Sequence, residues 1–114
     1  MQNMQTLVLV LSQYEKLDKL LIELNNADIN GATVINSTGM AQVLSQETDV
    51  FLGSIRSFLT PAREDNRTIF MALDEDSIET AKKVIHKVIG SLDEPGTGVL
   101  FIIPVLYFEG THNT

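Results

Sequence analysis

The sequence predicts an α+β fold of order βαββαβ, in which a four-stranded antiparallel sheet carries two helices on one face. Apolar runs at residues 7–11, 68–73 and from 99 onward, and a β-branched stretch at 32–35, indicate four strands. Two stretches with apolar residues three and four apart indicate a helix after the first strand and another after the third. A long segment without the period-2 pattern of a strand, residues 38–66, separates the second strand from the third.

The first strand and the first helix follow each other directly. Residues 7–11 are an uninterrupted aliphatic run, which is typical of a strand buried on both faces. Ser12 and Glu15 form a capping-box pattern, so we expect the helix to begin at Ser12. The apolar face of this helix is expected to hold Tyr14, Leu17, Leu20, Leu21 and Leu24.

The second strand leads into the long connection. Gly31 precedes a β-branched stretch that predicts a strand ending near Ser37. Connections as long as residues 38–66 are uncommon in a small domain and are usually functional or disordered. Helical spacing of apolar residues at 51–59, with Pro61 as a stop, predicts a short helix inside it.

The third strand, the second helix and the fourth strand complete the fold. Asp76 and Glu79 predict the start of the helix, and Gly90 predicts its end. Its apolar face is expected to hold Ile78, Ala81, Ile85, Val88 and Leu92. The element order is that of the ferredoxin-like sandwich. We therefore expect one domain over residues 1–109 and a disordered tail at 110–114.

Two helices can cover only one face of the predicted sheet. The first strand, however, is apolar at both odd and even positions, as Leu7 and Leu9 alternate with Val8 and Val10. An apolar sheet face is rarely left exposed, so packing against copies of the same chain is expected. A closed ring with the sheets facing inward would satisfy this, although periodicity does not fix the number of subunits.

Composition excludes several classes of protein. The 114 residues include no cysteine, which excludes disulfides, thiolate metal sites and a cysteine nucleophile. A net charge of −7 without a basic stripe argues against a nucleic-acid partner. The apolar stretch at 99–108 is about half as long as a membrane-spanning helix and contains Pro104. With no leader-like pattern at the N-terminus, we expect a cytoplasmic protein without membrane insertion.

Neither catalysis nor metal binding is predicted. The carboxylates at 74–76 and 93–94 lie beside predicted helix ends, and no nucleophile, base and orienting group come together. His86 lies on the solvent side of its helix, and His112 lies in the polar tail. No catalytic residue, metal ligand or obligatory cofactor is therefore assigned.

A glycine-rich turn precedes the fourth strand. In the segment Pro95-Gly96-Thr97-Gly98, successive backbone N–H groups can turn inward and form an anion-binding nest. The alternative is a tight turn that only joins helix to strand. The turn alone leaves both interpretations open.

Two short motifs resemble those of a known family. Gly31-Ala-Thr-Val34 with Gly39 resembles the second strand and T-loop entry of the PII nitrogen-regulatory signalling proteins, and Gly96-Thr-Gly98 with Leu100 and Phe101 resembles their B-loop and last strand. With the element order, the resemblance spans nearly the whole chain. It implies a homotrimer that binds adenine nucleotides such as ATP or ADP in clefts between subunits. It also implies a regulated partner protein contacted by the T-loop, here residues 38–66.

The resemblance implies ligand-binding roles for particular positions: Thr33, Gly39, Gly96, Thr97 and Gly98. The family usually has a lysine after the second glycine, where this chain has Val99. The T-loop entry also differs, at residues Thr38, Ala41, Gln42 and Val43. Arginines in or beside the long connection, Arg56, Arg63 and Arg67, are candidates to supply the missing charge. The alternative for these arginines is solvated surface charge.

Two alternatives to a nucleotide-sensing regulator stay open. One is a structural or metal-associated trimer resembling the divalent-cation tolerance proteins of the same superfamily. The other is a degenerate member that binds no nucleotide and serves only for protein contact.

Overall fold

A computed structural model describes residues 3–40, 43–44 and 66–110. In chain order its elements are β1 (Met4–Leu11), the 3₁₀ turn η1 (Tyr14–Lys16), α1 (Leu17–Asn26), β2 (Ala32–Ser37), β3 (Asn66–Asp74), α4 (Glu75–Ile89) and β4 (Gly98–Pro104). The predicted βαββαβ order and fold class are confirmed. The helix predicted at 51–59 and residues 111–114 of the predicted tail lie outside the described residues.

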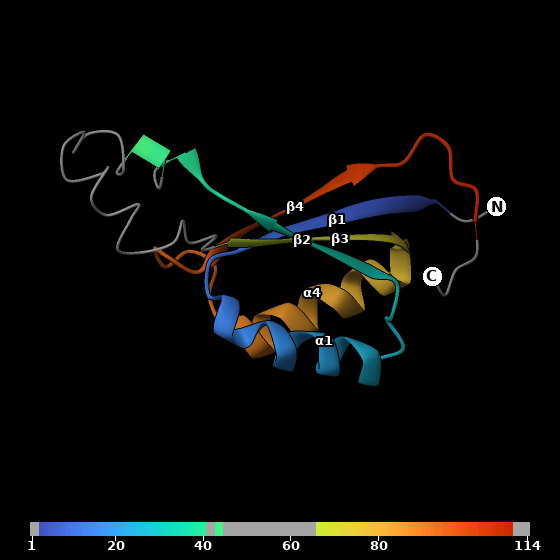
Figure 1. The fold of residues 1–114 in the computed structure, drawn as a ribbon. Helices are drawn as coiled ribbons and strands as arrows, with labels where there is room; N and C mark the ends of the chain where they lie inside the picture. The colour runs from blue at the N-terminus through green and yellow to red at the C-terminus, as the bar shows by residue number, and fades with distance from the viewer. Residues whose placement is uncertain (1–2, 41–42, 45–65, 111–114) are drawn as a thin grey trace.

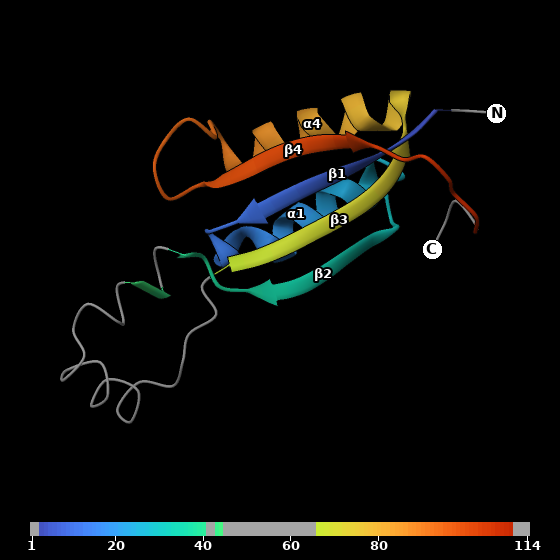
Figure 2. The same cartoon turned by 90° about the horizontal axis from the view of Figure 1, so that it is seen from above.

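The four strands form one antiparallel sheet in the order β2-β3-β1-β4. Figure 2 shows the two central strands, β1 and β3, flanked by β4 and β2. The long pairing between β1 and β3 runs from Met4 opposite Asp74 to Leu11 opposite Arg67. Because β1 lies in the centre, its aliphatic run is covered on both edges by neighbouring strands, as expected for a buried strand.

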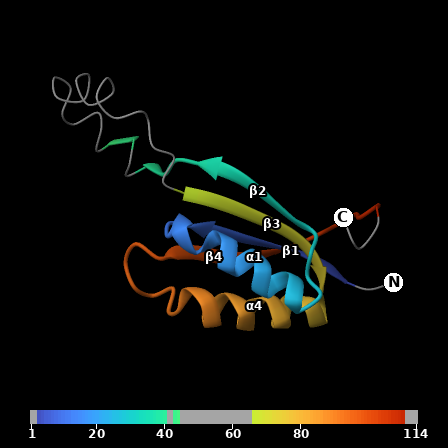
Figure 3. The same ribbon diagram turned by 60° about the horizontal axis from the view of Figure 1, so that its bottom comes forward.

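Both helices lie side by side on the same face of the sheet (Figure 1, Figure 3). The core between the layers contains Leu7, Leu9, Leu11, Ile69 and Met71 from the sheet, Leu20 and Leu24 from α1, and Ile78, Ala81, Ile85 and Ile89 from α4. These residues recur every second position on the strands and every three or four on the helices. The core residues therefore have the strand and helix periodicities that the sequence predicts.

Both helix starts differ from the predicted ones. Ser12 caps nothing: the chain makes η1 first, without a side-chain cap, and α1 begins only at Leu17. Tyr14 is 42% exposed, so it does not belong to the buried helix face. The second helix begins one residue before the predicted Asp76, because Asp74 is the N-cap and its carboxylate accepts a hydrogen bond from the Ser77 N–H at 2.8 Å.

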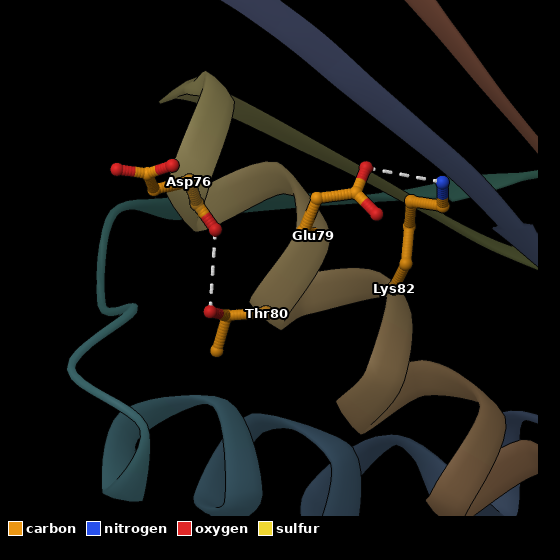
Figure 4. Close-up of polar contacts among 4 residues, drawn as sticks. All are labelled: Asp76, Glu79, Thr80 and Lys82. Atoms are coloured by element: carbon orange, nitrogen blue, oxygen red, sulfur yellow. Dashed lines mark hydrogen bonds and ion pairs between the residues drawn. The ribbon is translucent and has the colours of Figure 1, made fainter.

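The outer face of α4 carries short-range polar contacts (Figure 4). The Thr80 hydroxyl donates to the Asp76 carbonyl at 3.2 Å, and the Lys82 ammonium pairs with Glu79 at 3.2 Å. His86 is exposed on this helix as predicted, and the N–H of the C-cap Gly90 donates to the His86 carbonyl. Exposed pairs of this kind contribute little stability, so burial of the opposite face holds the helix in place.

The face of the sheet away from the helices is open and apolar. Val99, Phe101 and Ile103 alternate along β4 on this face and are 59%, 45% and 47% exposed. Phe101 and Phe70 are both paired with the central Val8, and together they leave Val8 only 5% exposed. We call this surface the open sheet face; its large apolar residues are Val8, Val10, Ile35, Phe70, Val99, Phe101 and Ile103, and the register places Thr33 and Thr68 on it as well. Its apolar character agrees with the sequence-based expectation.

No described helix is both long enough and apolar enough to cross a lipid bilayer.

Candidate functional site

One end of the sheet gathers most of the residues that the sequence assigned to ligand binding. Asn36 is paired with Arg67, Arg67 with Leu11, and Leu11 with Gly98, so these four residues form one row across all four strands. The glycine turn leads into this row on β4, and Gly39 lies three residues beyond it on the chain that leaves β2. We call this the polar end of the sheet.

The two glycines of the turn are favoured at their positions for different structural reasons. A Cβ atom on Gly98 would lie 2.6 Å from the Val10 carbonyl oxygen, closer than side-chain atoms approach a backbone. Gly96 has a φ of +79° with open space around it, so only its backbone conformation favours glycine. Gly98 is therefore required by the packing of the turn against β1, whatever the turn binds.

Buried polar side chains are concentrated at this end. Among the described residues, the buried polar side chains are Asn66, Thr68 and Thr97, all close to strand ends in or beside the row. The Thr68 hydroxyl shares a hydrogen bond of 2.8 Å with Ser37, and the Thr97 hydroxyl donates to the Glu94 carbonyl at 2.7 Å. Buried polar groups cost free energy unless they are paired, and these hydrogen bonds provide that pairing. The polar end is thus a hydrogen-bonded framework.

Arg67 lies on the helix side of the polar end. Its guanidinium lies 5.3 Å from the centre of the Tyr14 ring and donates to the Asn66 carbonyl at 3.2 Å. Stacking of this kind holds the planar guanidinium in a fixed orientation. Arg67 is therefore a positioned cation, half-buried against η1, and not a freely solvated surface charge.

Not all the predicted positions come together. Thr33 is exposed on the open sheet face, four residues before the end of β2, which is about 13 Å along a strand. Arg63 and Arg56 lie outside the described residues. Gly96, Thr97, Gly98 and Arg67 thus lie at one end of the sheet. Gly39 leaves the same end of β2, but β2 and β4 are opposite edges of the sheet, so Gly39 lies across the sheet from the glycine turn, and Thr33 lies apart from both.

Sequence reasoning missed four residues of this end, which are Gln13, Tyr14, Ser37 and Asn66. Tyr14 was assigned to the helix core because its spacing fits the helical repeat, yet the 3₁₀ geometry of η1 turns it toward Arg67. Gln13 has a buried Oε1 without a hydrogen-bond partner among the described residues. A signal was available for Ser37 and Asn66, because polar residues at the ends of paired strands meet across the sheet.

Within the described ranges, His, Asp and Glu side chains form no group that could hold a metal ion.

Comparison with solved structures places the fold. The chain superposes on Arabidopsis thaliana PII bound to citrate with a TM-score of 0.62 and 16% identity, over 91% of this chain and 78% of that one. The fold is that of a PII protein. A functionally unknown protein from Pediococcus pentosaceus shares the PII-like fold of this chain, with a TM-score of 0.66 and 16% identity over 97% of this chain and 100% of that one. Comparison with protein-family models and with curated proteins finds no match.

This comparison confirms the fold that the resemblance in sequence implies. The glycine turn and the beginning of the long connection lie at the same end of the sheet, on its opposite edges β4 and β2. At 16% identity the comparison shows the fold and not what the chain binds.

Proposed function

We propose that this chain is a cytoplasmic, homotrimeric regulator of the PII type and not an enzyme. In this proposal residues 1–109 form one domain that senses a small ligand, of the adenine-nucleotide class, in clefts between subunits. The connection 38–66 then transmits the state of the cleft to a partner protein. The ligand-binding residues are those of the polar end, Gly39, Gly96, Thr97, Gly98 and Arg67, with Thr33 and Arg63 as further candidates.

The open sheet face is the observation that carries the proposal. Its exposed side chains come from three strands and include Phe70 on β3, Ile35 on β2 and the alternating residues of β4. Large contiguous apolar patches on a soluble domain mark interaction surfaces. A ring of identical copies covers such a face on every subunit with one type of contact. That arrangement favours an assembly over a monomeric enzyme with its own active site.

The polar end supports ligand sensing. It borders the open sheet face, since Val99 follows Gly98 directly and Thr68 pairs with both Ile35 and Val10. When copies pack through the open face, the polar end lies at the margin of the contact, where clefts between subunits form. It also lies at the start and finish of the connection 38–66, because Ser37 and Asn66 are paired there. A ligand at this end would therefore act directly on the residues where that connection leaves β2 and enters β3.

Calorimetric titration of the purified assembly tests the ligand class. We expect saturable binding of at least one of ATP, ADP, AMP and the cyclic dinucleotides, with a stoichiometry of one per chain. Substitution Arg67→Ala should weaken that binding by about tenfold, because it removes the positioned cation. An assembly that binds none of these compounds would contradict the sensing function and favour a degenerate trimer kept for protein contact.

A further inference from the structure

The polar groups of Thr97 in the glycine turn form hydrogen bonds within the protein. The Thr97 hydroxyl donates to the Glu94 carbonyl, the Thr97 side chain is only 4% exposed, and the Thr97 carbonyl accepts the Ser12 N–H at 3.1 Å. This hydroxyl is therefore not directed at a ligand, and any contribution of Thr97 to ligand binding comes from its backbone. The turn is closed by bonds to its own chain and to the end of β1.

The charged side chains that the turn presents to solvent are carboxylates. Asp93 and Glu94 are both exposed, and residues 91–99 contain no lysine or arginine. The backbone hydrogen bond between Ser12 and Thr97 places the chain that enters η1 next to the turn. Glu15 and Lys16 of η1 oppose each other in charge, and Arg67 is stacked on Tyr14. Each phosphate added to a ligand at this end would therefore bring negative charge toward Asp93 and Glu94.

Uncharged groups at the same end suit the neutral part of a ligand. The Gln13 Oε1 atom is buried and has no hydrogen-bond partner in the described part of the chain. A buried acceptor in this state is stabilised by an N–H donor. Its neighbour Tyr14 presents a half-exposed aromatic ring held by Arg67. A donor-bearing planar heterocycle, such as a nucleobase, has both complementary features.

We infer that the polar end selects ligands of low charge, a nucleoside or nucleoside monophosphate in preference to a nucleoside diphosphate or triphosphate. The inference rests on the proposed function and names its ligand class. It assigns recognition to the neutral groups of Gln13 and Tyr14, with Arg67 matching at most one phosphate. Asp93 and Glu94 act against longer phosphate chains.

Titration with adenosine, AMP, ADP and ATP, in EDTA to exclude divalent cations, tests the inference. We expect the affinity to fall from AMP to ATP by about tenfold at low salt, because repulsion grows with each phosphate. Added sodium chloride should raise the affinity for ATP, since screening weakens that repulsion. Tightest binding by ATP, with an affinity that falls as salt rises, would overturn the inference and leave the proposed function intact.

A pair of charge-neutralising variants identifies the groups responsible. Asp93→Asn with Glu94→Gln should raise the affinity for ATP about threefold and that for adenosine not at all. Glu75→Gln with Asp76→Asn is the matched control, because it changes the net charge equally at the opposite end of the sheet, where α4 begins. Equal effects of the two pairs would contradict a local role for the turn. Absence of binding to all four compounds would overturn this inference, and it would overturn the proposed function as well if the cyclic dinucleotides also fail to bind.

Discussion

At the scale of single residues, Gly98 is the position where the turn has least freedom. An added Cβ would meet the Val10 carbonyl oxygen at 2.6 Å, and neither atom can rotate away, because the oxygen belongs to the backbone and the Cβ position is set by the backbone. We expect Gly98→Ala to lower the free energy of unfolding by about 2–3 kcal/mol, through overpacking and backbone strain. Urea denaturation at fixed protein concentration measures this change.

Gly96→Ala is the matched control for that substitution. Gly96 also has a positive φ, of +79°, but nothing lies within 4 Å of its added Cβ. Only the backbone conformation is penalised, which costs about 1 kcal/mol. Equal losses at the two positions would show that the contact with Val10 does not constrain the turn.

Tyr107 provides a spectroscopic test of the segment that follows β4. Its hydroxyl donates to the Glu109 carboxylate, and this hydrogen bond, with a smaller contribution from desolvation, raises the pKa of Tyr107 above its ordinary value. Ionisation loses the bond and places a phenolate beside a carboxylate. Glu109→Gln should therefore lower the pKa of Tyr107.

Tyrosinate absorbance follows this titration directly, because the chain has two tyrosines and no tryptophan. A Tyr14→Phe background removes the other tyrosine from the signal. An unchanged titration midpoint after Glu109→Gln would show that the two side chains do not interact in solution.

The sequence predicts the residue types of the site better than their roles. The glycines and Arg67 could be identified as candidates because turn-forming residues and positive charges can be recognised from the sequence alone. The stacking of Arg67 on Tyr14 could not be predicted, since it depends on a 3₁₀ turn and on the pairing of Leu11 with Arg67 across the sheet. Likewise, only the close approach of Val10 shows that Gly98 is required for packing.

At the scale of elements, the N-terminus of α4 is held by one side chain. Asp74 accepts the Ser77 N–H, so it satisfies a free donor of the first helical turn and opposes the helix dipole. Asp74→Ala should lower the free energy of unfolding by about 1 kcal/mol. Chemical denaturation measures the loss.

Ser12→Ala serves as the comparison, because Ser12 has the sequence pattern of a helix cap but caps no helix. We expect a change of less than about 0.5 kcal/mol for it. A cost for Ser12→Ala as large as that for Asp74→Ala would mean that the first helix begins with a capping box in solution.

Strand and helix identities follow from periodicity, whereas helix starts do not. The aliphatic alternation of β1 and the helical spacing of α4 identify both elements, since each pattern matches one buried face. Capping patterns overlap, and two acidic residues near a helix start compete for the same role. At α4 the structure favours Asp74, whose extended backbone places its carboxylate against Ser77.

At the scale of the whole molecule, the sheet has one covered and one open face. Leu7, Leu9 and Leu11 lie under the helices, whereas the alternate residues Val8 and Val10 lie on the open face with Phe70 and Phe101. Residues 7–11 of β1 and 99–103 of β4 are apolar at both odd and even positions. The apolar character of both sheet faces could therefore be predicted from the sequence. Periodicity does not give the ligand or the number of copies, which only the resemblance to the PII proteins implies.

The mass of the assembly in solution, measured by light scattering, tests the central claim most directly. We expect three times the 12.6 kDa of one chain for the natural protein. Phe101→Glu should reduce the mass to that of one chain, because it places a charge within the apolar open sheet face. Ile22→Glu, an equal change at a 59% exposed site on α1, should leave the larger mass intact. A natural protein that remains a stable single chain at all concentrations would contradict the account.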